Sequence, residues 1–207
     1  MARIRRGIGS MLSGKTDGMV FVQLDGETYM RTAPQRSKSS WTPKQLLHRK
    51  RFREVTGFCT QFSLYLIPQI WRPAAKKMTG HALFLKTNMP AFGLDGSLAD
   101  PKMLHFSTGK LPLPQQFKAG RTAVESTTIA VSWNNDPYLD PQRLTDQLMA
   151  ISAGNGNYSY LTSTGLVRGL MNGSFELPQQ PADATHIYLF FASGDRRDYS
   201  ESACFEI

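Results

Sequence analysis

Residues 185–192 read Thr-His-Ile-Tyr-Leu-Phe-Phe-Ala, and the apolar run within them, residues 187–191, is the natural core of a β-sheet. Trp133, at the end of an alternating run, is expected to pack in the same core. Short strands at regular spacing, with turn-forming residues and no helical pattern between them, predict an antiparallel β-sandwich over residues 100–207. The further candidate strands are residues 102–107, 127–133, 146–151, 158–162, 166–171, 173–177 and 200–206.

Upstream of this region, Thr42 marks the start of a helix. Thr42 suits the N-cap, Pro43 suits the first helical position, and Gln45 completes a capping box. Apolar residues then recur at a 3-4-3-4 spacing, which predicts one apolar stripe along a helix that ends before Pro68. A second, shorter helix is predicted within residues 69–88, so that the two helices form a hairpin. The stripe consists of Phe52, Val55, Cys59, Phe62 and Leu66.

The first 40 residues have a different character. Residues 1–18 are rich in Gly and Arg and contain little to pack, which predicts an arm that becomes ordered only against a partner. Met19–Leu24 and residues 27–31 flank Asp25-Gly26, a favoured pair for a type I′ hairpin turn. The predicted fold class is therefore α+β, with a basic arm and β-hairpin over residues 1–40, a helical hairpin over 41–90 and an antiparallel β-sandwich over 100–207.

Positive charge is concentrated in the N-terminal part of the chain. The sequence has 24 Lys and Arg against 16 Asp and Glu, a formal net charge of +8. Residues 1–90 hold 16 of the basic and 4 of the acidic residues, a net charge of +12, whereas residues 91–207 carry −4. This asymmetry predicts that the first part contacts nucleic acid, an acidic protein face or the acidic part of a neighbouring copy.

Several of these cations crowd the first turns of the predicted helix, where they oppose the helix dipole and therefore indicate a binding role. Tyr29 and Trp41 offer partners for base stacking. The sequence contains no helix-turn-helix, zinc-finger or RNP motif, so any nucleic-acid binding is expected to be sequence-independent and strongly salt-dependent. The candidate contact residues are Arg3, Arg5, Arg6, Lys15, Arg31, Arg36, Lys38, Lys44, Arg49, Lys50, Arg51 and Arg53.

Residues 9–16, Gly-Ser-Met-Leu-Ser-Gly-Lys-Thr, match the phosphate-binding pattern G-x-x-x-x-G-K-[ST]. A working loop of this kind needs a buried strand before it and a helix after it. Here residues 3–6 are Arg-Ile-Arg-Arg, and Asp-Gly and the predicted hairpin follow the match. We therefore interpret the match as a coincidence within a Gly- and Ser-rich arm.

Other chemistry has no local signature in the sequence. The 4 histidines are scattered along the chain, and Asp136, Asp140 and Asp146 lie in or beside Pro-containing loops, which is too little to predict a Ca²⁺ site. Cys59 and Cys204 fit neither a disulfide framework nor a metal-ligand spacing, which predicts buried free thiols. We predict no enzyme activity, no cofactor, no metal and no small-molecule substrate.

The N-terminal residues carry positive charge, but no apolar stretch of signal-peptide length follows them. No window approaches the roughly 18 apolar residues of a membrane span. The chain is therefore expected to be made in the cytoplasm and not exported.

Several features occur together in this chain: a short basic start, Ser-Gly-Lys with further glycines, a hairpin ending in Arg, and a Thr-x-x-Gln…Arg…Phe helix. The residues that carry them are Met1, Ala2, Arg3, Ile4, Ser13, Gly14, Lys15, Arg31, Thr42, Gln45, Arg49, Phe52 and Asn88, with the runs 187–191 and 200–204. In this pattern the chain resembles a group of uncharacterised bacterial and phage proteins with a C-terminal immunoglobulin- or fibronectin-like domain. The resemblance implies that fold for the sandwich and a structural role for Ser-Gly-Lys. It carries no assigned activity, and the phage-like context of similar proteins implies a virion or assembly role.

Two functional hypotheses follow. In the first, the protein is a structural or assembly accessory whose basic part docks onto a larger complex, while the sandwich is displayed or contacts neighbours. The opposite charges of the two parts permit head-to-tail contacts between copies. In the second, it is a sequence-independent nucleic-acid-binding accessory. A nucleotide-hydrolysing enzyme is a third and weaker hypothesis, because it depends on the phosphate-loop match alone.

Overall fold

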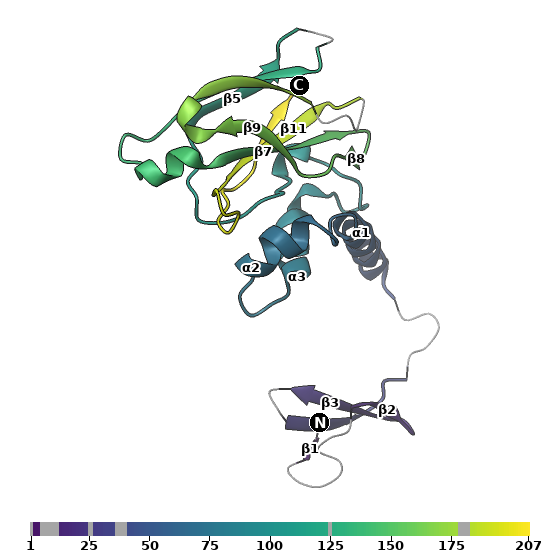
Figure 1. The fold of residues 1–207 in the computed structure, drawn as a ribbon. Helices are drawn as coiled ribbons and strands as arrows, with labels where there is room; N and C mark the ends of the chain where they lie inside the picture. Colours follow the sequence, from purple (N-terminus) through teal and green to yellow (C-terminus); the bar gives the residue numbers. More distant parts are fainter. Residues whose placement is uncertain (1, 5–12, 25–26, 36–40, 124–125, 178–182) are drawn as a thin grey trace. The chain divides into compact units, whose positions relative to one another are not determined.

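The computed structural model describes residues 2–4, 13–24, 27–35, 41–123, 126–177 and 183–207, and the chain forms two compact units, Met1–Thr42 and Pro43–Ile207 (Figure 1). Helices and antiparallel sheets occur together, which confirms the predicted α+β class. The predicted segments 41–90 and 100–207 lie almost entirely within the second unit.

The first unit contains a four-stranded antiparallel sheet in the order β1-β4-β3-β2. The predicted hairpin is confirmed, since β3 and β4 pair along their whole length from Met19 with Thr32 to Leu24 with Glu27. The expected turn residues, Asp25 and Gly26, lie outside the described residues. The strands are β1 (Ala2–Ile4), β2 (Gly14–Thr16), β3 (Met19–Leu24) and β4 (Glu27–Thr32).

The interpretation of residues 1–18 as an arm without its own structure is corrected for its described parts. β1 pairs with β4, and β2 pairs with β3. Between β2 and β3, Asp17 and Gly18 have φ values of 44° and 76°. Positive φ at both central residues is the feature of a type I′ turn, so a second Asp-Gly pair of this sequence forms a hairpin turn.

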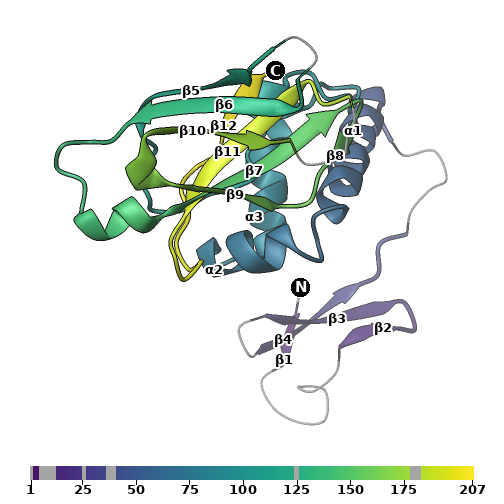
Figure 2. The ribbon, with the colours of Figure 1, turned by 45° about the horizontal axis from the view of Figure 1, so that its top comes forward.

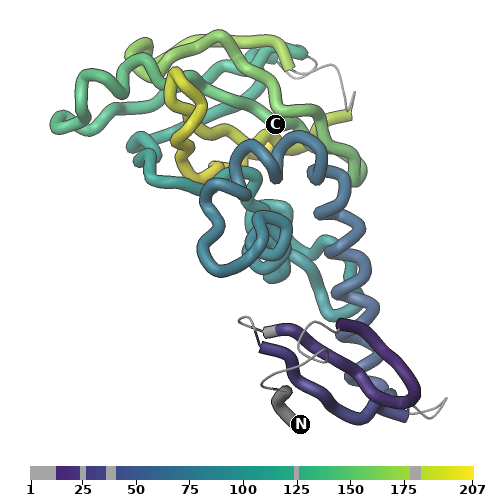
Figure 3. Tube along the Cα trace, turned by 60° about the horizontal axis from the view of Figure 1, so that its bottom comes forward, coloured from purple at the N-terminus to yellow at the C-terminus, as the bar shows by residue number. Residues whose placement is uncertain are grey.

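The second unit begins with helices, which lie side by side in Figure 3. The first helix begins at Pro43 and ends before Pro68, as predicted, but its last residue is Thr60, so Phe62 and Leu66 of the predicted stripe lie beyond it. After Thr60 the backbone hydrogen bonds first span three residues, as in a 3-10 turn, where the amide of Phe62 donates to Cys59 O. They then span five residues, as in a π-helix, where the amide of Ile67 donates to Phe62 O. The helices are α1 (Pro43–Thr60), a π-helix (Ile67–Trp71), α2 (Arg72–Ala74) and α3 (Gly80–Asn88).

Two antiparallel sheets follow the helices. One has the strand order β10-β6-β5, and the other has the order β12-β11-β7, with β8 and β9 both paired to β7. The strands are β5 (Gln115–Arg121), β6 (Thr128–Asn134), β7 (Gln147–Gly154), β8 (Asn157–Tyr158), β9 (Thr162–Val167), β10 (Asn172–Glu176), β11 (His186–Ala192) and β12 (Ala203–Glu206). Short 3-10 helices occur at Met89–Ala91, Pro101–Met103, Pro141–Thr145 and Arg168–Leu170.

Four of the predicted strands are wrong in part or in full. Residues 158–162 span the gap between β8 and β9 instead of forming one strand, and residues 200–206 form a strand only from Ala203. Residues 102–107 contain no strand, because Asp100 accepts a hydrogen bond from the amide of Lys102 and Pro101 occupies the first position of a 3-10 turn. The prediction for residues 166–171 fails after Val167, where the 3-10 helix Arg168–Leu170 begins.

The sheet that contains β7 and β11 is covered on both faces (Figure 2). Alternate residues of β7 and β11 pack with the helices in one hydrophobic core, together with Phe58, Phe62 and Phe84. The other residues of both strands pack with β6 and β10 in a second core. Trp133 lies in this second core with Phe191 at 5.4 Å between ring centroids, which confirms its predicted packing.

Candidate functional site

The N-terminal half of α1 is exposed around its whole circumference. Residues 43–50 are all exposed, and the first core residue of the helix is Val55. The helix buries Val55, Phe58 and Cys59 against α3 and the sheet, so its earlier turns extend past the part of the core that could cover them. These turns therefore form a surface that is available to a partner.

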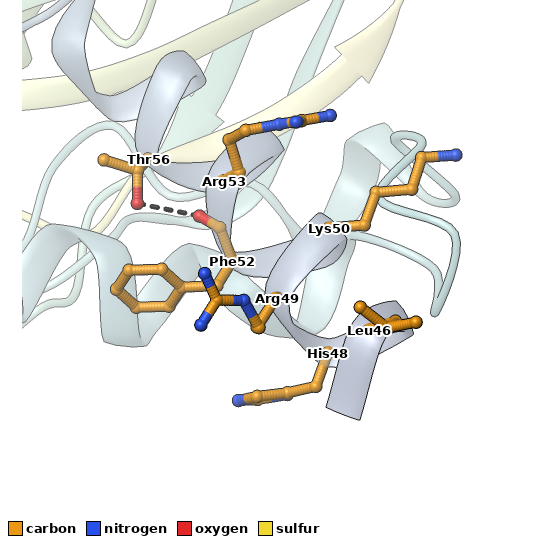
Figure 4. Close-up of a pocket in the computed structure, with 7 residues that line it drawn as sticks. All are labelled: Leu46, His48, Arg49, Lys50, Phe52, Arg53 and Thr56. Atoms are coloured by element: carbon orange, nitrogen blue, oxygen red, sulfur yellow. Dashed lines mark hydrogen bonds between the residues drawn. The ribbon is translucent and has the colours of Figure 1, made fainter. Parts of the chain in front are cut away.

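This surface combines large apolar side chains with cations. Leu46 and Phe52 are about half exposed, at 53% and 48%, and Leu47 is exposed as well. Phe52 was predicted to belong to the apolar stripe of the core, and that assignment is wrong because α1 reaches its first core contact only at Val55. Figure 4 shows Lys50 and Arg53 extending outward from the helix. The residues that line a shallow concave surface here, which we call the α1 surface, are Leu46, His48, Arg49, Lys50, Phe52, Arg53 and Thr56.

The structure brings four of the predicted contact residues together on α1, namely Lys44, Arg49, Lys50 and Arg53, and all four are exposed. Arg53 also forms an exposed ion pair with Glu54 at 3.1 Å. An exposed pair of this kind contributes at most about 1 kcal/mol, so it leaves Arg53 able to exchange partners.

Arg51 differs from its neighbours on α1. Its side chain is half-buried, and Nη2 donates a 2.7 Å hydrogen bond to the carbonyl oxygen of Met89. Arg51 therefore ties α1 to the 3-10 helix Met89–Ala91, and this internal contact sets it apart from the exposed cations.

Two further predicted cations lie in the N-terminal sheet. Lys15 pairs with Val20 across β2 and β3, and Val20 pairs with Arg31 across β3 and β4. Directly paired residues project from the same face of a sheet, so Lys15, Val20 and Arg31 form one row. Both cations are exposed. Arg3 pairs with Tyr29 in β4, whereas Arg5, Arg6, Arg36 and Lys38 lie outside the described residues.

The opposite face of this sheet has a different composition. Phe21 pairs with Gly14 on one side and with Met30 on the other, and the neighbouring row contains Met19 with Thr16 and Thr32. These two rows carry no charge. The sequence alone gave no sign of this separation into a basic row and uncharged rows, because it depends on the strand register.

The two residues proposed for base stacking lie in different environments. Trp41 is 40% exposed. Tyr29 is half-buried, and its hydroxyl donates to Oε2 of Glu27 at 2.9 Å.

The phosphate-loop match lacks the structural context that it needs within the described residues. Gly14–Thr16 form a strand, and the Asp17-Gly18 turn and β3 follow, where a nucleotide-binding loop would continue into a helix. Residues 9–12 lie outside the described part of the chain.

Metal and thiol chemistry gains no support from the side chains. Within the described residues no group of three or more His, Cys, Asp or Glu is arranged to hold a metal ion. Cys59 and Cys204 are free thiols; Cys59 is buried, as predicted, whereas Cys204 is only half-buried. Burial raises the pKa of the Cys59 thiol to about 12, which keeps it in the unreactive protonated form near neutral pH.

Among the described helices, none combines the length and the apolar character needed to cross a membrane. Comparison of the chain with family models, with curated proteins and with solved structures gives no match.

Proposed function

We propose that this protein is a non-enzymatic assembly accessory that docks onto a larger complex through its basic N-terminal part, with the α1 surface as the principal contact. The observation that carries the proposal is the presence of Leu46 and Phe52 among exposed cations, with the exposed Leu47 next to this surface, on turns that the rest of the second unit does not cover. The partner is expected to be an acidic protein surface with an apolar depression.

The mixture of residue types favours a protein partner over nucleic acid. Interfaces between proteins place apolar side chains at the centre and charged ones at the rim. Burying one leucine or phenylalanine side chain contributes about 1.5–3 kcal/mol. A phosphate backbone offers no comparable apolar surface to Leu46 and Leu47, so these two exposed leucines would gain little from it.

The sheets would serve as the displayed part of the protein. We infer an immunoglobulin- or fibronectin-like β-sandwich from the second core, in which residues of both sheets interdigitate. The resemblance to phage proteins supports incorporation into a virion or a related assembly after synthesis in the cytoplasm.

Nucleic-acid binding is the second candidate, and a separate observation favours it. Arg49, Lys50 and Arg53 follow one another at helical spacing on α1, and Lys15 and Arg31 stand in one row of the N-terminal sheet. Such rows suit a phosphate backbone and bind without sequence preference.

One pair of measurements separates these functions. A photo-cross-linking amino acid at position 46, in extracts of the cells that make the protein, should give a discrete protein adduct. The same amino acid at position 64 is the control, since Leu64 is 91% exposed but lies outside the α1 surface. The adduct should be lost when Arg49, Lys50 and Arg53 are changed to Glu.

Fluorescence anisotropy with labelled DNA and RNA supplies the second measurement. Absence of binding at low salt, together with the position-46 adduct, supports docking to a protein. Tight binding with a steep salt dependence, abolished by the same charge reversal and without a protein adduct, would replace the docking proposal with the nucleic-acid one.

A further inference from the structure

A second cavity lies in the second unit, away from α1, and has a volume of about 360 Å³. Residues 112–115 and 138–140 form most of its walls, and Arg143 and Arg168 contribute its cationic groups. Two prolines, Tyr138 and Leu139 make the walls largely apolar. A cavity with apolar walls and a few convergent polar groups is the usual form of a small-molecule site.

Arg168 is one of the largest fully buried side chains of the protein, with 1% of its surface exposed. Its Nη2 donates to the carbonyl oxygen of Pro112 at 2.9 Å, and its guanidinium carbon lies 4.1 Å from the centre of the Phe191 ring. Its Nε lies 3.4 Å from Oδ2 of Asp146, but neither of these two buried atoms has a hydrogen-bond partner within the described residues. These contacts hold the guanidinium rigidly at the wall of the cavity.

The carboxylate of Asp146 is shared between two guanidinium groups. Nη1 of Arg143 lies 3.8 Å from Oδ1 of Asp146, whereas Arg168 faces the other carboxylate oxygen, Oδ2. Among these three side chains, two positive groups and one negative group leave an excess of one positive charge. Burial raises the pKa of Asp146, and the two arginines partly offset that effect.

The other carboxylates of the cavity, Asp136 and Asp140, are exposed and already serve the backbone. Oδ1 of Asp136 accepts from the amide of Tyr138 at 2.8 Å, and Oδ1 of Asp140 accepts from the amide of Gln142 at 2.9 Å. Both act in turns at the exposed end of the cavity. Their negative charge remains, but because both carboxylates are exposed, water screens it, so they offset only part of the positive potential beside the buried Arg168.

We propose that this cavity binds a small organic carboxylate, which pairs with Arg143 and Arg168 and places its apolar part against Pro112, Tyr138 and Leu139. A guanidinium offers planar donors that match the two oxygens of a carboxylate, and the bonds are strengthened by both charges. The same chemistry is present in a free carboxylic acid and in the C-terminus of a peptide. This site is independent of the α1 surface and of the docking proposal.

The test compares acids with their amides on the full chain. Isothermal titration with N-acetyl amino acids that have aliphatic or aromatic side chains, each paired with its carboxamide, isolates the carboxylate. We expect at least one acid to bind about tenfold or more tightly than its amide, the difference expected for a charged hydrogen bond. Short peptides ending in the same residue, free or amidated at the C-terminus, then distinguish a free acid from a peptide end.

Arg143→Gln is the informative variant, because Arg143 is about one-third exposed and its replacement leaves the buried Arg168 in place. It should weaken binding of the acid about tenfold and leave binding of the amide unchanged. Lys118→Gln is the matched control, since Lys118 is an exposed cation of β5 outside the cavity. Equal binding of acids and amides, no binding by any of the compounds at millimolar concentration, or equal losses in the two variants would overturn the proposal.

Discussion

Tyr188 and Leu189 are neighbours in β11, yet their side chains belong to two different hydrophobic cores. Both are fully buried. Because successive side chains of a strand point to opposite faces, β11 has the helices on the side of Tyr188 and β6 and β10 on the side of Leu189. A strand covered on both faces has a continuous apolar run instead of an alternating one, which explains the composition of residues 187–191.

Truncation on either face of β11 should therefore be costly. Leu189→Ala and Phe190→Ala remove buried side chains from the two cores, and each should lower the free energy of unfolding by about 2–5 kcal/mol. Urea-induced unfolding followed by circular dichroism measures both losses. Leu64→Ala, at a 91% exposed position, should change the value by no more than about 0.5 kcal/mol. If one of the core variants matched Leu64→Ala, the corresponding face of β11 would not be packed.

The sequence predicted which residues of β11 are buried better than it predicted which elements pack against them. An apolar run reports that a strand is buried, but it does not say which elements cover its two faces. The helices of residues 43–88 cover one of these faces, and nothing in the local pattern indicates that long-range contact. β5 was missed for another reason: Gln115–Arg121 is polar, and its pairing with β6 is irregular at Gln116, which has a φ of 50°.

The candidate site was predictable in part. Arg49, Lys50 and Arg53 could be selected from the sequence as candidates, because cations near the start of a helix oppose the helix dipole. Helical spacing placed Phe52 on the core face, but spacing does not reveal where the covering core ends, and the side chain is 48% exposed. The cavity at Arg168 had only one weak signal, a single arginine within the apolar residues 166–171. Its contacts with Asp146 and Pro112 arise from the fold.

Gly80 and Gly57 should respond in opposite ways to the same substitution. A Cβ at Gly80 would lie 2.6 Å from the backbone nitrogen of Arg72, so Gly80→Ala requires α2 and α3 to separate. The substitution should lower the free energy of unfolding by about 1–3 kcal/mol. At Gly57, an exposed position in α1, a Cβ would meet nothing within 4 Å. Gly57→Ala should therefore stabilise the helix by about 0.5–1 kcal/mol. Thermal unfolding should show midpoints shifted down and up, respectively, and a raised midpoint for Gly80→Ala would refute the close approach.

Glu176 should make stability depend on pH in the acid range. Its carboxylate accepts hydrogen bonds from the hydroxyls of Thr128 and Thr127, each at 2.7 Å, and these bonds lower its pKa below the ordinary value. A carboxyl with a lowered pKa in the folded state stabilises the fold above its unfolded pKa of about 4.3 and loses that contribution as the pH falls through the folded pKa. Glu176→Gln should thus be less stable than the parent protein at pH 7.

The pH profile supplies the check on Glu176. Urea midpoints of the parent and of Glu176→Gln should converge as the pH falls from 5 toward 3. In a Thr127→Ala, Thr128→Val background the convergence should be reduced, because the two donors are gone. If the urea midpoints of the parent protein and of Glu176→Gln differed by the same amount at every pH, the contacts with the two threonine hydroxyls would not depend on the charge of the carboxylate.

Arg168 and Asp146 should behave as a coupled pair. Arg168→Met leaves the buried carboxylate of Asp146 without its nearest positive partner and should cost about 3–5 kcal/mol. Asp146→Asn leaves the arginine uncompensated, whereas the double variant leaves neither charge behind. The loss of unfolding free energy in the double variant should therefore be smaller than the sum of the losses in the two single variants.

A double-mutant cycle of the pair by urea unfolding at neutral and acid pH tests both the coupling and its cause. Burial already raises the pKa of Asp146, and Arg168 is the larger of the two charges that oppose this rise, so its removal should raise the pKa further. A carboxyl with a raised folded pKa stabilises the fold at low pH and loses that contribution as the pH rises. The deficit of Arg168→Met should accordingly be smaller at acid than at neutral pH. Additive losses, or a deficit that does not change with pH, would mean that the two buried side chains act independently despite their 3.4 Å separation.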